Sequence, residues 1–229
     1  MLTLCPICAA VCREHRLQSP YWRCGNCDVL FQDPMPEKRY HGSHEAPPEQ
    51  MSDADKAANE YVAGWLFDTV MKGKPGPTLD IGCAYPYLAS RLKARGCIAW
   101  AIDGDETPSD LSVLKISADF ERWNADKFAE EYQPILITMI HNFEHMYRPL
   151  DAFRKLRRLI ADDGRLFIRS PDHRVPGIER DMTPGHFEIH PYCHTLSSIL
   201  ECCVQTNTFV VESYEQMQPG QMNVVLVPI

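Results

Sequence analysis

Residues 78–92 place the strongest constraint on what this chain can fold into. Residues 79–81 are typical of the apolar end of a buried strand. Gly82 and two further small residues predict a tight turn, and apolar residues then recur at helical spacing through Leu92. A strand, a small-residue turn and a helix form a corner that binds cofactors, because the helix N-terminus presents free backbone N–H groups. The segment therefore predicts an α/β fold with a binding site at this corner.

The same alternation of strands and helices continues along the chain. Further strands are predicted at residues 97–102, 111–116, 135–140, 165–169, 209–211 and 223–227. Residues 135–140 form a nearly continuous apolar run, which is typical of a central parallel strand buried on both faces. The last two segments predict an antiparallel pair that closes the sheet. The sequence thus predicts a doubly wound, Rossmann-like sheet of the α/β class, mostly parallel with an antiparallel final strand.

The string Leu-Asp-Ile-Gly-Cys at residues 79–83 resembles the first motif of class I S-adenosylmethionine (SAM) dependent methyltransferases. In that family a Gly-x-Gly-x-Gly turn lets the backbone approach the amino acid end of the cofactor. Here the second and third glycine positions are Ala84 and Pro86. Each adds a Cβ and narrows the space for a ligand. Proline at the first helical position is tolerated, because its missing N–H would have no helical partner.

The resemblance implies a set of SAM-binding residues at the carboxyl ends of the strands. They are Asp80, Gly82, Cys83, Ala84, Tyr85, Asp103, Asp119 and His141. Asp103 ends the second predicted strand of the sheet, where an acidic side chain can accept hydrogen bonds from both ribose hydroxyls. Asp105 and Glu106 are nearby alternatives for that role. Asp119 lies where the family often contacts the adenine.

The N-terminal region carries two pairs of cysteines, Cys5 with Cys8 and Cys24 with Cys27. Two such C-x-x-C knuckles predict a zinc site with four thiolate ligands. A redox pair or two disulfides are the alternatives, but a redox motif would open a helix after a strand, and no strand precedes Cys5. Zinc also supplies folding free energy that so small a core lacks. We expect Gly25 to supply a positive φ within the second knuckle.

These features predict three parts of the chain. Residues 1–40 form the zinc ribbon, residues 41–51 form a linker or lid rich in proline, histidine and glutamate, and residues 52–229 form the methyltransferase domain. Ser52 is expected to cap the first helix of that domain.

Polar residues follow the central predicted strand at His141, Glu144 and His145. Doubly wound proteins place their chemistry at this edge of the sheet. In the ubiquinone-type O-methyltransferases, which the chain also resembles here, an acidic residue three positions before the glutamate helps to hold a divalent metal. That position is His141 in this chain, so the three residues form a possible second metal site. The alternative is that Glu144 and His145 orient the turn and the next helix.

Three histidines and a carboxylate gather in residues 186–194, after the fifth predicted strand of the sheet. This region resembles the His-Glu-His-x-x-Tyr segment of sugar C-methyltransferases, which also carry an N-terminal zinc element with four cysteines. Histidine can remove a proton from an acceptor near neutral pH. We therefore predict His190 or His186 as the general base. The alternative is that residues 186–194 form a surface loop without a catalytic role. The other predicted catalytic residues are Glu188, His145 and Tyr192.

Composition limits the partners of the protein. A net charge of -8 argues against a nucleic acid partner, which usually requires clustered lysine and arginine. The sequence has no apolar run of membrane-spanning length and no signal-peptide pattern at its start, so we expect a soluble, cytoplasmic protein. The leading hypothesis is methyl transfer from SAM to a small polar acceptor, a sugar or sugar nucleotide, at carbon or oxygen. A degenerate scaffold protein and a zinc-ribbon RNA methyltransferase are the alternatives.

Overall fold

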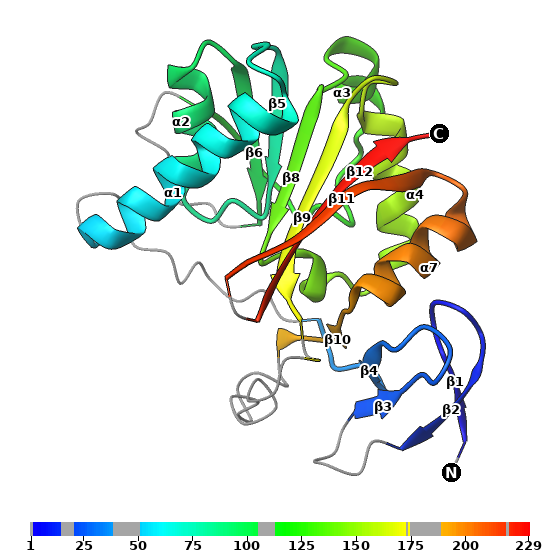
Figure 1. Cartoon of the computed structure of the whole chain (residues 1–229). Helices are drawn as coiled ribbons and strands as arrows, with labels where there is room; N and C mark the ends of the chain where they lie inside the picture. Colours follow the sequence, from blue (N-terminus) through cyan, green and yellow to red (C-terminus); the bar gives the residue numbers. More distant parts are fainter. Residues whose placement is uncertain are drawn as a thin grey trace.

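The computed structural model describes residues 2–14, 21–38, 51–104, 113–172, 174, 189–218 and 220–229. Figure 1 shows an α/β body built on one large sheet, with a small N-terminal ribbon packed at its lower end. The predicted linker, residues 41–51, lies outside the described residues except for its last position. Within the described ranges, no helix combines the length and the apolar character needed to cross a membrane.

The large sheet confirms the predicted fold class. Its seven strands, in spatial order, are β11 (Phe209–Gln218), β12 (Gln221–Pro228), β9 (Arg165–Pro171), β8 (Leu136–Ile140), β5 (Pro77–Ile81), β6 (Ile98–Asp103) and β7 (Leu114–Ser117). The five strands from β9 to β7 are parallel, whereas β12 runs antiparallel to both β9 and β11. The final strand therefore lies inside the sheet, and β11 forms its edge.

Helices cover both faces of this sheet (Figure 1). The first face carries α1 (Asp53–Trp65), its π-helical extension Leu66–Val70, and α2 (Tyr87–Ala94). The second carries α3 (Asp126–Glu131), α4 (Pro149–Leu159) and α7 (Leu196–Thr206). Ser52 caps α1 as predicted, since its hydroxyl accepts a hydrogen bond of 3.1 Å from the N–H of Asp55.

Side chains that alternate in direction along each strand divide the hydrophobic core between the two faces of the sheet. Leu136 and Phe167 pack with α1 and α2, whereas their neighbours Ile137 and Ile168 pack with α4 and α7. All four side chains are fully buried. Successive side chains of a strand point to opposite faces, so a strand covered on both sides is mostly apolar. This requirement explains the long apolar runs of the sequence at β6 and β8.

The ribbon contains the strands β1 (Thr3–Leu4), β2 (Val11–Glu14), β3 (Tyr21–Arg23) and β4 (Leu30–Gln32). A fifth strand comes from far along the chain, because β10 (Tyr192–Cys193) pairs antiparallel with β4. Tyr192 lies opposite Phe31, and Cys193 lies opposite Leu30. The ribbon sheet is thus completed by residues that we had assigned to the methyltransferase domain.

Candidate active site

The four predicted zinc ligands come together in the ribbon. Sγ of Cys5 lies 3.6 Å from Sγ of Cys27, and Sγ of Cys8 lies 3.4 Å from Sγ of Cys24. All four sulfur atoms lie within 4.8 Å of one another. Tetrahedral zinc with Zn–S bonds of about 2.3 Å requires sulfur atoms about 3.8 Å apart, so the donor set fits a zinc ion. The hydrogen bond from the Cys27 thiol lowers the pKa of Cys5 to about 5.

The backbone of the second knuckle differs from the prediction in one respect. Gly25 is not among the residues with positive φ, and that conformation falls on Asp28, with φ of 56°. Asp28 donates its N–H to the carbonyl of Cys24 at 3.0 Å. The turn therefore closes one residue after the second cysteine, and an aspartate tolerates the left-handed region better than most side chains do.

The glycine turn at the end of β5 has the geometry that a cofactor corner needs. Gly82 adopts φ of 72° and Ala84 adopts φ of 49°. Ala84 occupies the second glycine position of the family motif and keeps the left-handed conformation that glycine would adopt there. This conformation costs an alanine about 1 kcal/mol, so the surrounding contacts must hold the turn in place.

Two side chains from neighbouring strands hold this turn. Asp103, at the end of β6, accepts a hydrogen bond of 2.7 Å from the N–H of Ala84 through Oδ2. Lys115, on β7, donates to the carbonyl of Ala84 at 3.0 Å. Asp103 therefore lies at the corner, where one of its carboxylate oxygens fixes the turn; its contact with the ribose stays a prediction. Lys115 was not identified from the sequence, because its partner is a backbone carbonyl in a turn 31 positions earlier in the chain.

Asn142 packs directly against the glycine turn. A Cβ added to Gly82 would lie 2.0 Å from Nδ2 and 2.2 Å from Cγ of Asn142. The Oδ1 atom of Asn142 is buried and has no hydrogen-bond partner among the described residues. A buried acceptor of this kind requires a donor, and the ammonium group of the SAM amino acid end would provide one. The corner thus fits SAM: Gly82 lets Asn142 pack against the turn, and Oδ1 of Asn142 would be an acceptor for the cofactor.

Two other predicted cofactor residues, Asp80 and Asp119, have partners within the protein. Asp80 is buried, and its Oδ1 accepts a hydrogen bond of 2.6 Å from the Thr138 hydroxyl across the β5–β8 pair. Asp119 forms an ion pair of 2.8 Å with Lys38, which also contacts Glu121. Asp80 therefore braces the strands below the turn, and Asp119 ties the end of the ribbon to the loop after β7. Cys83 and Tyr85 are both buried within the turn.

A second group of polar side chains follows β8. The short 3-10 helix Phe143–His145 carries Glu144 and His145, and the ligand atoms of these two residues and of His190 lie within 4.8 Å of one another. The rings of His145 and His190 stack at 4.6 Å between centroids, with 28° between their planes. The structure therefore corrects the predicted trio, because His190 takes the place of His141. The half-exposed His141 reaches Glu144 only through one contact of 3.6 Å.

Two opposing effects act on the buried carboxyl of Glu144. Burial raises its pKa, but the contact with His141 and the charges of His145, His141 and His190 lower it to about 2. Its Oε2 atom is buried and has no hydrogen-bond partner in the described part of the chain. A buried carboxylate without full hydrogen bonding must be balanced by a nearby cation, which is either an imidazolium or a bound metal ion.

The orientation of His145 follows from its backbone partner. Its Nδ1 lies 2.7 Å from the carbonyl oxygen of Ile189. A carbonyl can only accept, so Nδ1 carries the hydrogen and Nε2 of the neutral ring has a lone pair. That lone pair can accept a proton or bind a metal.

Three predicted catalytic residues remain: Tyr192, His186 and Glu188. Tyr192 is only 1 % exposed and forms part of the ribbon sheet, with its ring stacked on His194. Burial also raises its pKa. We therefore correct its assignment from catalysis to packing. His186 and Glu188 lie outside the described residues.

The sheet order, with an antiparallel last strand inserted beside the fifth parallel strand, and the glycine corner define a class I SAM-dependent methyltransferase. The chain belongs to the methyltransferase domain family, because the family model described as "Methyltransferase domain" matches residues 33–212. The match begins inside the ribbon at its β4 end and continues into β11.

Known proteins of related sequence and structure agree with this class. A ubiquinone biosynthesis O-methyltransferase from Pseudomonas paraeruginosa is 29% identical over 118 residues, covering 48% of this chain and 50% of that protein. The chain spans about half the length of the curated relatives it matches. PH0226 from Pyrococcus horikoshii superposes with a TM-score of 0.61 at 17% identity, covering 78% of this chain and 92% of the other.

A third similar protein was solved with ligands. It is the 1,6-didemethyltoxoflavin-N1-methyltransferase from Burkholderia thailandensis, bound to 1,6-didemethyltoxoflavin and S-adenosylhomocysteine. It superposes with a TM-score of 0.56 at 12% identity, covering 93% of this chain and 96% of that protein. At this identity the likeness shows the fold alone.

Proposed function

We propose that this protein transfers a methyl group from SAM to a small polar acceptor, most simply a sugar or sugar nucleotide, with an imidazole of the His145 and His190 pair as the general base. The observation that carries the proposal is the position of Glu144, His145 and His190 beside the glycine corner. Asn142 contacts Gly82 and is only two residues before Glu144 in the chain. The polar cluster and the cofactor corner are therefore neighbours at one edge of the sheet.

When bound, SAM supplies an electrophilic methyl group attached to a sulfonium. Transfer requires the acceptor atom, the methyl carbon and the sulfur to lie in line, so positioning provides much of the acceleration. As the acceptor atom takes the methyl group and the carbon–sulfur bond breaks, the acceptor proton would pass to Nε2 of His145 or to the ring of His190. The carboxylate of Glu144 then stabilises the imidazolium, as an aspartate does in a catalytic triad.

The relatives support the chemistry of methyl transfer. One is named a ubiquinone biosynthesis O-methyltransferase, and a protein of the same fold was solved with 1,6-didemethyltoxoflavin and S-adenosylhomocysteine. The sugar acceptor depends on the resemblance of residues 186–194 to the sugar C-methyltransferases and on the four-cysteine ribbon that both share.

The first experiment measures the binding of SAM and S-adenosylhomocysteine to zinc-loaded protein by calorimetry. We expect both compounds to bind. If neither binds, the protein is better explained as the degenerate scaffold protein that the sequence left as an alternative. The second measures transfer of a radiolabelled methyl group to a panel of sugar nucleotides. On an acceptor found in this way, His145→Gln and His190→Gln should each lower kcat by about 100-fold or more.

The same transfer assay distinguishes the two cations that could balance the charge of the Glu144 carboxylate, an imidazolium or a bound metal ion. Treatment with a chelator that leaves the ribbon zinc in place should not change turnover when a histidine is the base. Loss of turnover that Mg²⁺ or Mn²⁺ restores would assign the cluster to a second metal instead. His141→Gln then tests whether the fourth polar residue of this region contributes to that metal.

A further inference from the structure

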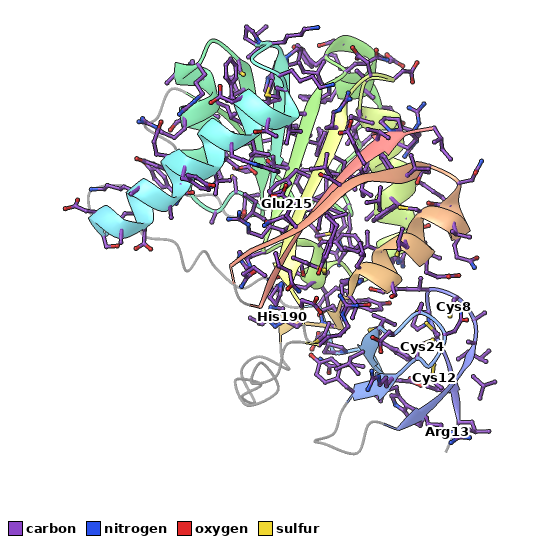
Figure 2. All side chains as sticks on the ribbon, viewed as in Figure 1. Cys8, Cys12, Arg13, Cys24, His190 and Glu215 are labelled. Atoms are coloured by element: carbon purple, nitrogen blue, oxygen red, sulfur yellow. The ribbon has the colours of Figure 1, made fainter. Side chains whose placement is uncertain are left out.

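The ribbon contacts the chain segment that carries His190. The hydroxyl of Tyr21 donates to the carbonyl oxygen of His190 at 2.5 Å, and Nε2 of Gln32 donates to the same oxygen at 3.0 Å. The N–H of Gln32 also donates to the carbonyl of Pro191 at 3.0 Å. Figure 2 places His190 at the junction between the large sheet and the ribbon.

Both donors are held firmly in the ribbon. Tyr21 is 1 % exposed and Gln32 is 5 % exposed, and they lie directly opposite each other on β3 and β4. Buried polar groups of this kind nearly always have partners in folded proteins. Both side chains donate to the same carbonyl oxygen, that of His190. We call this pair of donors, Tyr21 and Gln32, the clasp.

The second cysteine knuckle joins the two halves of this clasp. Cys24 directly follows β3 and Cys27 lies three residues before β4, so the knuckle is the turn of the hairpin that presents Tyr21 and Gln32. The N–H of Cys24 donates to the carbonyl of Val29 at 3.0 Å within this turn. A metal bound by the four cysteines would therefore order the hairpin that carries the clasp.

The other side of the His190 segment is held by the candidate active site. The imidazole of His145 donates to the carbonyl of Ile189 and stacks on the ring of His190. Residues 189 and 190 are thus fixed between the ribbon and the Glu144 cluster.

We propose that Tyr21 and Gln32 are positioning residues, through which the metal-bound ribbon holds His190 against His145 and Glu144. Occupancy of the four-cysteine site and the position of His190 are then coupled. Coupling of this kind is reciprocal, so loss of the clasp must weaken metal binding by the same factor by which loss of the metal weakens the clasp. The catalytic meaning of the proposal rests on the proposed role of His190, but the coupling itself does not.

The test uses the full, zinc-loaded chain and a double variant, Tyr21→Phe with Gln32→Leu. These substitutions nearly keep the size of both side chains and remove the two donors to the His190 carbonyl, together with the amide oxygen of Gln32 and the contacts of the Tyr21 hydroxyl with Gln32 and Cys193. A matched control, Tyr61→Phe with Gln205→Leu, makes the same changes at exposed positions on α1 and α7. The readouts are the imidazole Cε1–H resonance of His190, assigned from its loss in His190→Gln, and amide hydrogen exchange in residues 189–193.

We expect the clasp variant to shift the His190 resonance and to accelerate exchange in residues 189–193 by at least tenfold, with zinc still bound. Its zinc affinity should fall by a similar factor, and the control should match the wild type. Chelation of zinc from the wild type should reproduce both changes. Tyr21→Phe alone, which removes one hydroxyl, gives a smaller change of the same sign and serves if the double variant does not fold.

The proposal would be overturned if the His190 resonance and the exchange rates of residues 189–193 were unchanged in the zinc-loaded clasp variant. It would also be overturned if removal of zinc from the wild type left both readouts unchanged. A wild type that fails to bind S-adenosylhomocysteine would instead refute the proposed function, while the coupling would still be measured. The two failures are therefore distinguishable.

Discussion

Replacement of Gly82 by alanine tests the cofactor corner most directly. The new Cβ would meet two separate obstacles, because the residue has φ of 72° and the Cβ would lie 2.0 Å from Nδ2 of Asn142. A left-handed alanine costs about 1–2 kcal/mol. Overpacking adds about 1–3 kcal/mol, because Asn142 must move away. We therefore expect Gly82→Ala to lower the free energy of unfolding by about 2–5 kcal/mol.

Gly73 provides a matched control for the backbone cost. It has nearly the same conformation, with φ of 68°, but no atom lies within 4 Å of the Cβ that an alanine would add. Gly73→Ala should therefore lower the free energy of unfolding by about 1–2 kcal/mol only. The difference between the two variants then measures the contact with Asn142.

Urea unfolding and calorimetry with S-adenosylhomocysteine provide the assay. Addition of Asn142→Gly to Gly82→Ala should restore the steric part of the lost stability but not the backbone part. Gly82→Ala should also weaken cofactor binding at least tenfold, whereas Gly73→Ala should not. If both glycine variants lost the same stability within about 0.5 kcal/mol, the close packing of Asn142 on the turn would be refuted.

Three other substitutions test the turn, the buried carboxylate and the core. Ala84→Gly removes a left-handed alanine, so it should raise the free energy of unfolding by up to about 1 kcal/mol in urea; a loss of stability would show that the Cβ packs usefully. Glu144 has a pKa of about 2 in the fold and an ordinary value of 4.5, so it contributes stability above pH 4.5 that is lost as the pH falls through 2. That contribution is about 3 kcal/mol, and acid titration of Glu144→Gln should show a flatter pH dependence below pH 4.5; equal curves would argue against an ionised Glu144. Phe153→Ala removes a fully buried ring between Phe143 and Phe209 and should cost about 3–5 kcal/mol in chemical denaturation, so a loss below 1 kcal/mol would contradict this packing.

Much of the large sheet was predictable because its signals are local. Apolar runs of about six residues mark β6 and β8, and shorter apolar stretches mark β5 and β9; each strand is followed by a turn or cap that the sequence also shows. The parallel arrangement of these strands follows from the helices predicted between them, because parallel strands need crossover connections. The extension of β11 to Gln218 was missed because residues 212–218 are mostly polar and form an edge strand.

The candidate site was predictable in type but not in membership. The sequence identified Glu144, His145 and His190 separately, yet it grouped the first two with His141. Which histidine lies beside Glu144 depends on the path of the chain after β9, which no local pattern records. In the same way Asp119 looked like a cofactor residue, and only the fold brought Lys38 to it across 81 positions.

The sequence by itself determined the individual strands of the sheet, the glycine corner and the pairing of the four cysteines into two knuckles, because each depends on residues within one turn or one strand of each other. Only the tertiary structure decided that the ribbon is completed by β10 and that Tyr21 and Gln32 hold the carbonyl of His190. Those contacts join residues separated by more than 150 positions. They arise because burial of the ribbon against the body leaves its polar groups no water to bind, so that each must find a partner wherever the fold brings one.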